Sequence, residues 1–155
     1  MPKLSNDDYR SLAAFRYQIR RFLAFSERAA REAGIEPRQH QLLLAVRGLP
    51  DGIRPTIRAI AERLCVQHHS AVALVDKLEA QGLIERQRCS TDRREVLLRL
   101  TPDGDAVLRK LSAVHREQLR GAGPAMVRAL EAITRERGEA NGAREPALDS
   151  VAERA

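Results

Sequence analysis

Two short helical patterns separated by only a few residues constrain this chain more than any other feature. Residues 57–64 carry apolar side chains at helical spacing behind Thr56, whose hydroxyl can cap a helix of about two turns. A second helical pattern covers residues 71–78 and is expected to stop at Gly82, where glycine accepts the left-handed conformation. Because only residues 65–67 connect the two patterns, the helices are expected to cross steeply as a helix-turn-helix.

The next stretch changes from helical spacing to strict alternation. Residues 84–88 and 96–100 each alternate between two kinds of side chain, which predicts the two strands of a half-buried hairpin. Within the connecting loop, Asp92 is placed to pair with Arg94 and hold the tip in one shape. Four arginines lie in or beside this loop, at positions Arg86, Arg88, Arg93 and Arg94.

This combination predicts a surface that reads double-stranded DNA. The second helix of a helix-turn-helix enters the major groove, and an arginine-loaded hairpin suits phosphates or a narrow minor groove. Thr56 is included in the expected contact surface because it opens the first of the two helices. The outward side chains expected to meet bases or phosphates are Gln67, His68, His69, Ser70, Ala73 and Lys77.

Composition agrees with this interpretation without proving it. The 155 residues suit one domain with a core, and the net charge of +6 suits a polyanionic partner or merely an arginine-rich solvated surface. No apolar run is long enough to span a bilayer and the N-terminus lacks a secretion signal, so a cytoplasmic protein is expected. Two cysteines are too few for a disulfide framework.

The remaining segments are expected to be mostly helical. Residues 8–33 and 37–46 have the pattern of helices, and residues 53–55 that of a short edge strand beside the hairpin. A helix of about five turns should follow Pro102, with a break at the glycines before Pro124 and a further helix after it. The first helix and these last two carry apolar stripes without an evident partner, so we expect them to interlock across a twofold axis.

The segment from residue 38 to residue 104 resembles the MarR family of winged-helix transcriptional regulators. The matching motifs are QLLLAVRG, IAERL, ALVDKLEAQGLIER and the wing signature DRREVLLRLT, in which Asp92 and Arg94 match the family's Asp-x-Arg. Cys65 stands where members often have glycine, and Ala73 where many have a longer polar side chain. The fold class is therefore expected to be mainly α with a small β-wing.

The resemblance implies a homodimer that binds a pseudo-palindromic DNA operator, most often as a repressor released by a small molecule or an oxidant. Together with the residue patterns it divides the chain into four segments: residues 1–34 as an N-terminal dimerisation helix, 35–101 as the DNA-binding lobe, 102–134 as C-terminal dimerisation helices, and 135–155 as a tail whose composition predicts a mobile or weakly helical segment. An effector pocket is expected between the first, second and fifth helices. Its candidate residues, which equally suit packing or surface ion pairs, are Phe15, Arg16, Tyr17, Ile19, Arg20 and His40.

Other kinds of chemistry have weaker support in the sequence. Cys65, His68 and His69 lie close together in the chain, but their spacing does not match a closed zinc module, and no metal or cofactor is expected. Cys89 follows a cation that favours a reactive thiolate, so a regulator of the same fold that responds to an oxidant, or to a metal, stays open. Cys65, between two apolar residues, is expected to be buried. No catalytic motif is evident, and the rival from another class is a winged-helix module for protein association.

Overall fold

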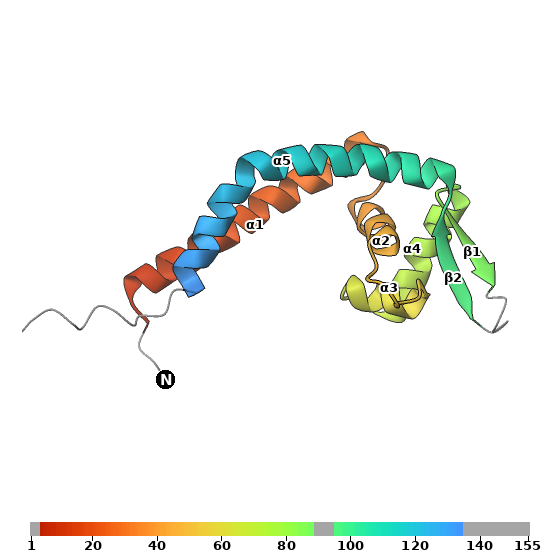
Figure 1. The fold of residues 1–155 in the computed structure, drawn as a ribbon, viewed down its shortest axis with the longest axis horizontal. Coiled ribbons are helices and arrows are strands. Elements are labelled where there is room, and N and C mark those ends of the chain that lie inside the picture. Colours follow the sequence, from red (N-terminus) through yellow and green to blue (C-terminus); the bar gives the residue numbers. More distant parts are fainter. Residues whose placement is uncertain (1–3, 89–94, 135–155) are drawn as a thin grey trace, which may run out of the picture.

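The computed structural model describes residues 4–88 and 95–134, and its helices and strands form a lobe joined to a long arm (Figure 1). The arm consists of the first and last helices, which lie side by side, and the remaining elements form the lobe at one end of it. In chain order the elements are α1 Asn6–Glu32, α2 Pro37–Arg47, α3 Ile57–Arg63, α4 His68–Ala80, β1 Ile84–Arg88, β2 Val96–Leu100 and α5 Pro102–Thr134. The mainly helical fold with one small hairpin is as predicted.

Helix α1 is closed at both ends by local signals in the sequence. Ser5 and Asp8 form a capping box at its start, with the Ser5 amide donating to the Asp8 carboxylate over 2.7 Å. At its end Gly34 has a φ of 81°, and the Ile35 amide donates back to the carbonyl of Ala30 over 3.1 Å. Only glycine adopts this conformation without strain, so the chain turns sharply here from the arm into the lobe.

The core lies inside the lobe and extends to the base of the arm. Each lobe helix and the hairpin contribute fully buried apolar side chains, and Ala30 of α1 and Leu108 and Leu111 of α5 join the same cluster. The arm is therefore anchored to the lobe by hydrophobic burial. The central buried side chains of the lobe are Leu42, Leu43, Ile60, Val75, Leu78, Ile84 and Leu98.

The hairpin has the two faces, one buried and one exposed, that its alternating pattern predicts. Strands β1 and β2 pair antiparallel, with Ile84 opposite Leu100 and Arg88 opposite Val96. Ile84 and Leu98 are buried on the inner face, whereas Glu85 and Arg99 lie opposite each other on the outer face. Alternation with a period of two therefore determines which side of the hairpin faces α4.

The predicted edge strand at residues 53–55 is not a strand. The sheet has two strands among the described residues, and the neighbouring chain contributes a single bridge between Thr56 and Leu97. Pro55 has no amide hydrogen to donate, so it contributes only its carbonyl, which accepts from the Leu98 amide over 2.8 Å. An ion pair between Arg54 and Glu95 completes the attachment of this segment to the hairpin.

The predicted break in the C-terminal region is also wrong, because α5 is one helix that continues through Pro124. A proline inside a helix removes one backbone hydrogen bond and kinks the helix without having to end it. Figure 1 shows α5 bending toward its C-terminal part, where it stays beside the start of α1. The tail expected to be mobile lies outside the described residues.

Candidate nucleic-acid interface

The turn between α3 and α4 is short and closed by backbone hydrogen bonds. The Thr56 hydroxyl accepts from the Ala59 amide over 3.2 Å and caps α3. At the other end of α3 the amides of Cys65 and Val66 donate to the carbonyls of Glu62 and Ala61 over 3.1 Å and 3.0 Å. This is a Schellman closure, and it sends the chain directly into the second helix as the helix-turn-helix prediction requires.

Cys65 occupies the left-handed position of this turn, with a φ of 52°, and is the one described non-glycine residue with positive φ. Its position explains why glycine is favoured there. The prediction that Cys65 is a buried core residue is wrong, because the side chain is exposed. A residue at this point of a Schellman turn projects away from the helix it terminates, so its apolar neighbours Leu64 and Val66 do not bury it.

Helix α4 separates a buried face from an exposed one. Ala71, Val75 and Leu78 are buried against the lobe and hold the helix in place. Most of the expected contact residues lie at its N-terminus or in its N-terminal half, and Lys77 lies in its last turn. Of these, Gln67, His68, His69, Ala73 and Lys77 are exposed and Ser70 is half-buried.

The N-terminus of α4 has no side-chain cap among the described residues. Gln67 takes the N-cap position without making a side-chain capping bond to any described residue, in contrast to Ser5 of α1 and Thr56 of α3. The first amides of an uncapped helix keep free hydrogen-bond donors and the positive end of the helix dipole. Such an end suits a phosphate group.

Arg86 has a different role from the one its sequence neighbours suggest. Its side chain is 26% exposed, and its guanidinium donates to Asp76 over 2.5 Å and to Glu79, both on α4. The hydrogen bond to Asp76 is the largest of the interactions that raise the pKa of Arg86. This geometry favours a brace between β1 and α4 over the phosphate contact expected of Arg86. The signal for this was its position in the alternation, on the same strand face as buried Ile84.

Arg88 is exposed at the end of β1 and stays a candidate phosphate contact. The other wing residues singled out in the sequence, Asp92, Arg93, Arg94 and the redox candidate Cys89, lie outside the described residues. Within residues 4–88 and 95–134 no group of three or more His, Cys, Asp or Glu side chains is arranged to hold a metal ion. In the same ranges no helix is both long enough and apolar enough to cross a membrane.

The residues expected to form an effector pocket lie on α1 and α2 and differ in their exposure. Arg16, Tyr17 and Arg20 are exposed on α1, and Tyr17 packs beneath the guanidinium of Arg21 at 5.8 Å. Phe15 and Ile19 are half-buried on the same helix. His40 alone is buried, at 3% exposure, and it lies against residues that the sequence interpretation did not select.

A histidine pair occupies the joint between the lobe and the arm. The ring of His40 on α2 lies 4.7 Å from that of His115 on α5, and Phe22 and Phe25 of α1 approach His115 edge-on. His115 donates from Nδ1 to the Leu111 carbonyl over 2.7 Å, so in the neutral ring Nε2 accepts from the Ser26 hydroxyl over 2.8 Å. The buried Nδ1 of His40 has no hydrogen-bond partner among the described residues.

Folding stability is expected to fall as the pH is lowered because of His40. Burial, together with the neighbouring His115, lowers the pKa of His40 from 6.5 to about 4. Between these values the unfolded chain binds a proton that the folded chain does not, so stability is greatest above pH 6.5 and falls toward pH 4. The linked loss is on the order of 3 kcal/mol. Urea unfolding at several pH values gives the unfolding free energy as a function of pH. The slope of this free energy against pH should be smaller for His40→Gln than for wild type, whereas substitution of exposed His68 by Gln should leave the slope unchanged.

Comparison with known proteins agrees with the geometry. Residues 33–95 match the model of the MarR family. A relative named for transcriptional regulation of the hcr operon in Thauera aromatica is 33% identical over 103 residues, which cover 66% of this chain and 60% of that protein. The matched part of the chain thus spans less than two thirds of that relative's length.

Solved structures share the fold. AbsC, a MarR family transcriptional regulator from Streptomyces coelicolor, superposes with a TM-score of 0.68 at 18% identity, covering 84% of this chain and 91% of AbsC. A mutant of MepR from S. aureus bound to an oligodeoxyribonucleotide gives a TM-score of 0.59 at 21% identity, covering 77% of this chain and 82% of that one. The lobe is therefore a winged helix-turn-helix. Together with the family match, this shows that residues 33–95 form a domain of the MarR family.

Proposed function

We propose that the protein binds double-stranded DNA in a sequence-specific manner as a homodimer and represses transcription until a small molecule releases it from the DNA. The observation that carries the proposal is the N-terminal half of α4, where an uncapped helix end and polar side chains are exposed together on a helix held by the core. A rigid helix that presents such groups can read base edges in a major groove. MepR, which has the same fold, has been seen with an oligodeoxyribonucleotide bound.

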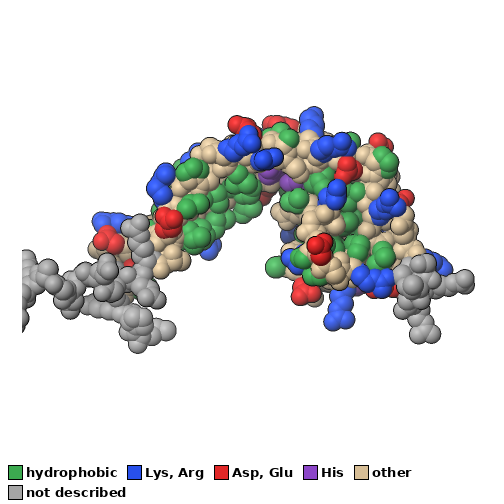
Figure 2. All heavy atoms as spheres, in the orientation of Figure 1, with side chains coloured by type: hydrophobic (Ala, Val, Ile, Leu, Met, Phe, Trp, Pro, Cys, Tyr) green, Lys and Arg blue, Asp and Glu red, His purple; other side chains and the backbone are tan. Residues whose placement is uncertain are grey.

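The arm supplies the proposed dimer interface. Large apolar side chains remain exposed along α1 and α5 after the two helices have packed on each other, and Figure 2 shows hydrophobic atoms along the concave side of the arm. A second copy related by a twofold axis would cover such a surface with the same residues. The exposed side chains are Tyr9, Leu12, Tyr17, Leu23, Val114, Leu119, Val127 and Leu130.

Dimerisation sets the proposed DNA geometry and its control. The two α4 helices would enter successive major grooves about 34–36 Å apart, while the wings reach the flanking minor grooves. In this scheme residues 1–34 and 102–134 hold the dimer and residues 35–101 read DNA. A bound effector would lower affinity by changing the spacing of the two lobes, because both half-sites must engage together.

We expect substitutions on α4 to separate base reading from phosphate binding. Gln67→Ala and Ser70→Ala should weaken binding to the preferred duplex by roughly 5- to 100-fold, with little effect on unrelated duplexes. Lys77→Ala should weaken binding to all duplexes and lower the slope of log affinity against log salt by about 1. Fluorescence anisotropy with both duplexes at several salt concentrations measures these effects. Equal losses on both duplexes for Gln67→Ala and Ser70→Ala would count against base reading.

The arm makes a separate prediction about assembly. Val127→Glu and Leu130→Glu should each raise the dimer dissociation constant by roughly 100-fold or more, since the twofold axis places two carboxylates in an apolar contact. Arg128→Glu, on the same turn, serves as the control and should have a smaller effect. Sedimentation equilibrium gives the constants, and a monomeric wild-type protein at micromolar concentration would overturn the proposed dimer.

A winged-helix module for protein association is the rival from another class. Specific DNA binding requires that affinity fall steeply with salt while one sequence stays preferred. An association module shows neither property. A gel-shift series with fragments of the protein's own genome at increasing salt distinguishes the two.

A further inference from the structure

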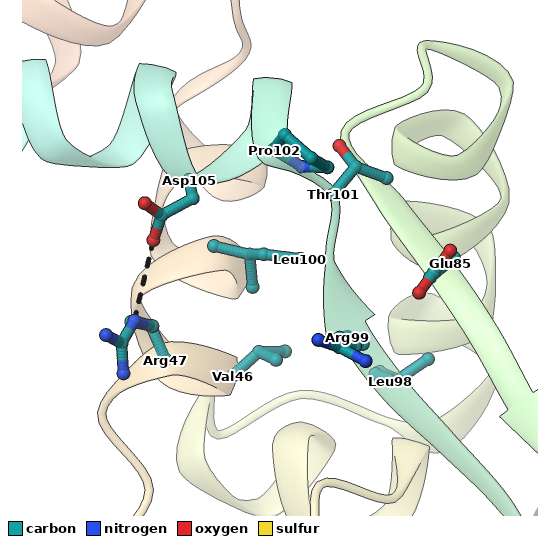
Figure 3. A pocket seen from close by; sticks show the side chains of 9 residues that line it. All are labelled: Val46, Arg47, Glu85, Leu98, Arg99, Leu100, Thr101, Pro102 and Asp105. Carbon is teal, nitrogen blue, oxygen red and sulfur yellow. Dashed lines mark ion pairs between the residues drawn. The ribbon is translucent and has the colours of Figure 1, made fainter.

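We propose a binding site for a small aliphatic carboxylate in a cavity on the outer side of the lobe, between α2, β2 and the start of α5. The cavity has a volume of ≈690 Å³, within the range of small-molecule sites in proteins. Figure 3 shows its lining residues, which come from elements that are separate in sequence. None of these residues belongs to the effector pocket expected from the sequence.

The walls of the cavity suit an aliphatic group. Val46 of α2, Leu98 and Leu100 of β2 and Pro102 at the start of α5 line it, and Leu100 points from the strand toward α2 (Figure 3). Among the residues that the structure describes, no aromatic side chain lines the cavity. A hydrocarbon chain placed here gains affinity by covering apolar surface, whereas an aromatic ring would find no stacking partner in this lining.

Two guanidinium groups can receive a carboxylate. Arg99 lines the cavity from the outer face of β2 and has no ion-pair or hydrogen-bond partner for its side chain within residues 4–88 and 95–134. Arg47 pairs with Asp105 at 3.5 Å, a long contact, and the same carboxylate lies 2.9 Å from Arg109. Because Asp105 is shared, Arg47 keeps donors for a ligand, and arginine binds carboxylates in a forked geometry.

The acidic residues of the cavity limit the charge of the ligand. Asp105 lies on one side, and Glu85, which accepts from the Gln87 amide group over 2.8 Å, lies on the other. Two carboxylates balance the two arginines, so a ligand with several negative charges would be repelled. The site therefore favours a monocarboxylate with an aliphatic tail.

Because the cavity lies between the wing and the arm, a bound ligand is expected to change the affinity for DNA. This expectation rests on the proposed function. A carboxylate held by both Arg47 and Arg99 ties α2 to the second wing strand, and the tail touches the start of α5. The orientation of the wing relative to the arm would then depend on whether the carboxylate occupies the cavity. The binding step itself requires no DNA, so it can be tested independently.

The test uses hexanoate as the probe and the full DNA-free protein labelled with ¹⁵N. Titration should give saturable amide shifts centred on Arg47, Arg99 and Thr101. Arg99→Gln should weaken hexanoate binding by roughly 10-fold or more because a charge-assisted pair is lost. Arg116→Gln removes an exposed arginine of α5 that does not line the cavity, and it should change binding less than about 2-fold. The neutral isostere hexanamide should bind at least roughly 10-fold more weakly than hexanoate.

Three results would overturn the site: no saturable shifts with hexanoate, shifts that Arg99→Gln leaves unchanged, or hexanamide binding as tightly as hexanoate. Fluorescence anisotropy with the preferred duplex, measured with and without hexanoate, then tests whether the ligand changes the affinity for DNA. Hexanoate binding without specific DNA binding would contradict the proposed function and leave the site standing. DNA binding without hexanoate binding would contradict the carboxylate site and leave the proposed function standing.

Discussion

Gly104→Ala is expected to destabilise the protein by about 3 kcal/mol or more, the largest effect we predict for a single methyl group. Gly104 lies in the first turn of α5, where the helix crosses the chain leading into β1. A Cβ atom there would lie 1.9 Å from the carbonyl oxygen of Leu83 and 2.8 Å from its carbonyl carbon. Both are backbone atoms, so the clash cannot be relieved by a side-chain rotation.

The same contact joins the arm to the wing. The carbonyl of Leu83 also accepts from the Thr101 amide over 3.2 Å, and the Thr101 hydroxyl donates to the carbonyl of Gly82 over 2.6 Å while it accepts from the Gly104 amide over 3.1 Å. Moving α5 away to make room for a methyl group would break this network. We therefore expect Gly104→Ala to weaken DNA binding as well, by altering how the arm holds the wing.

The control lies on the same helix. A Cβ atom added at Gly121 or Gly123 would have no atom of the described residues within 4 Å beyond its own stretch of helix, so Gly121→Ala and Gly123→Ala should stabilise α5 by roughly 0.5–1 kcal/mol. Urea unfolding of the three variants measures the free energies. If Gly104→Ala were as stable as wild type, the close packing of α5 on Leu83 would be wrong.

Arg86→Met is expected to lower affinity for the preferred duplex by roughly 100-fold, although Arg86 does not touch DNA in our scheme. The substitution leaves Asp76 and Glu79 on α4 without their arginine partner, and it frees the helix from β1. Two uncompensated carboxylates beside a phosphate-binding surface repel the duplex, and an unbraced helix reads it less well. Fluorescence anisotropy at fixed salt measures the loss.

A rescue experiment distinguishes a brace from a direct contact. The triple variant Arg86→Met, Asp76→Asn, Glu79→Gln removes the arginine together with both charges it neutralises. If Arg86 acts through α4, this variant should recover at least roughly 10-fold of the lost affinity. Arg88→Ala serves as the comparison, because exposed Arg88 is the proposed phosphate contact and its loss should lower the salt slope by about 1. A triple variant as weak as Arg86→Met would contradict the brace.

Much of the lobe could be predicted from its sequence because local rules and packing agree there. The spacing of residues 57–64 and 71–78, the cap at Thr56 and the stop at Gly82 define α3 and α4, and alternation defines the register of the hairpin. Each of these features depends on near neighbours in the chain. In the lobe the structure therefore keeps the predicted order of helices and hairpin strands, without the edge strand expected at residues 53–55.

The differences arise where the deciding partner is distant or where two rules compete. Pro124 and the glycines before it predict a break, but packing of α5 along α1 keeps the helix continuous across them. The sequence groups Arg86 with the wing arginines, although its partners Asp76 and Glu79 meet it only when β1 folds against α4. His115 lies against His40 from a distant part of the chain, so no local signal indicates their contact.

Selection of bound fragments from the protein's own genome tests the central claim most directly. We predict one enriched motif with two inverted half-sites about 10 base pairs apart, bound by two protomers, with affinity that falls steeply as salt is raised. Enrichment of no motif, or a complex with a single protomer on an unpaired half-site, would contradict it.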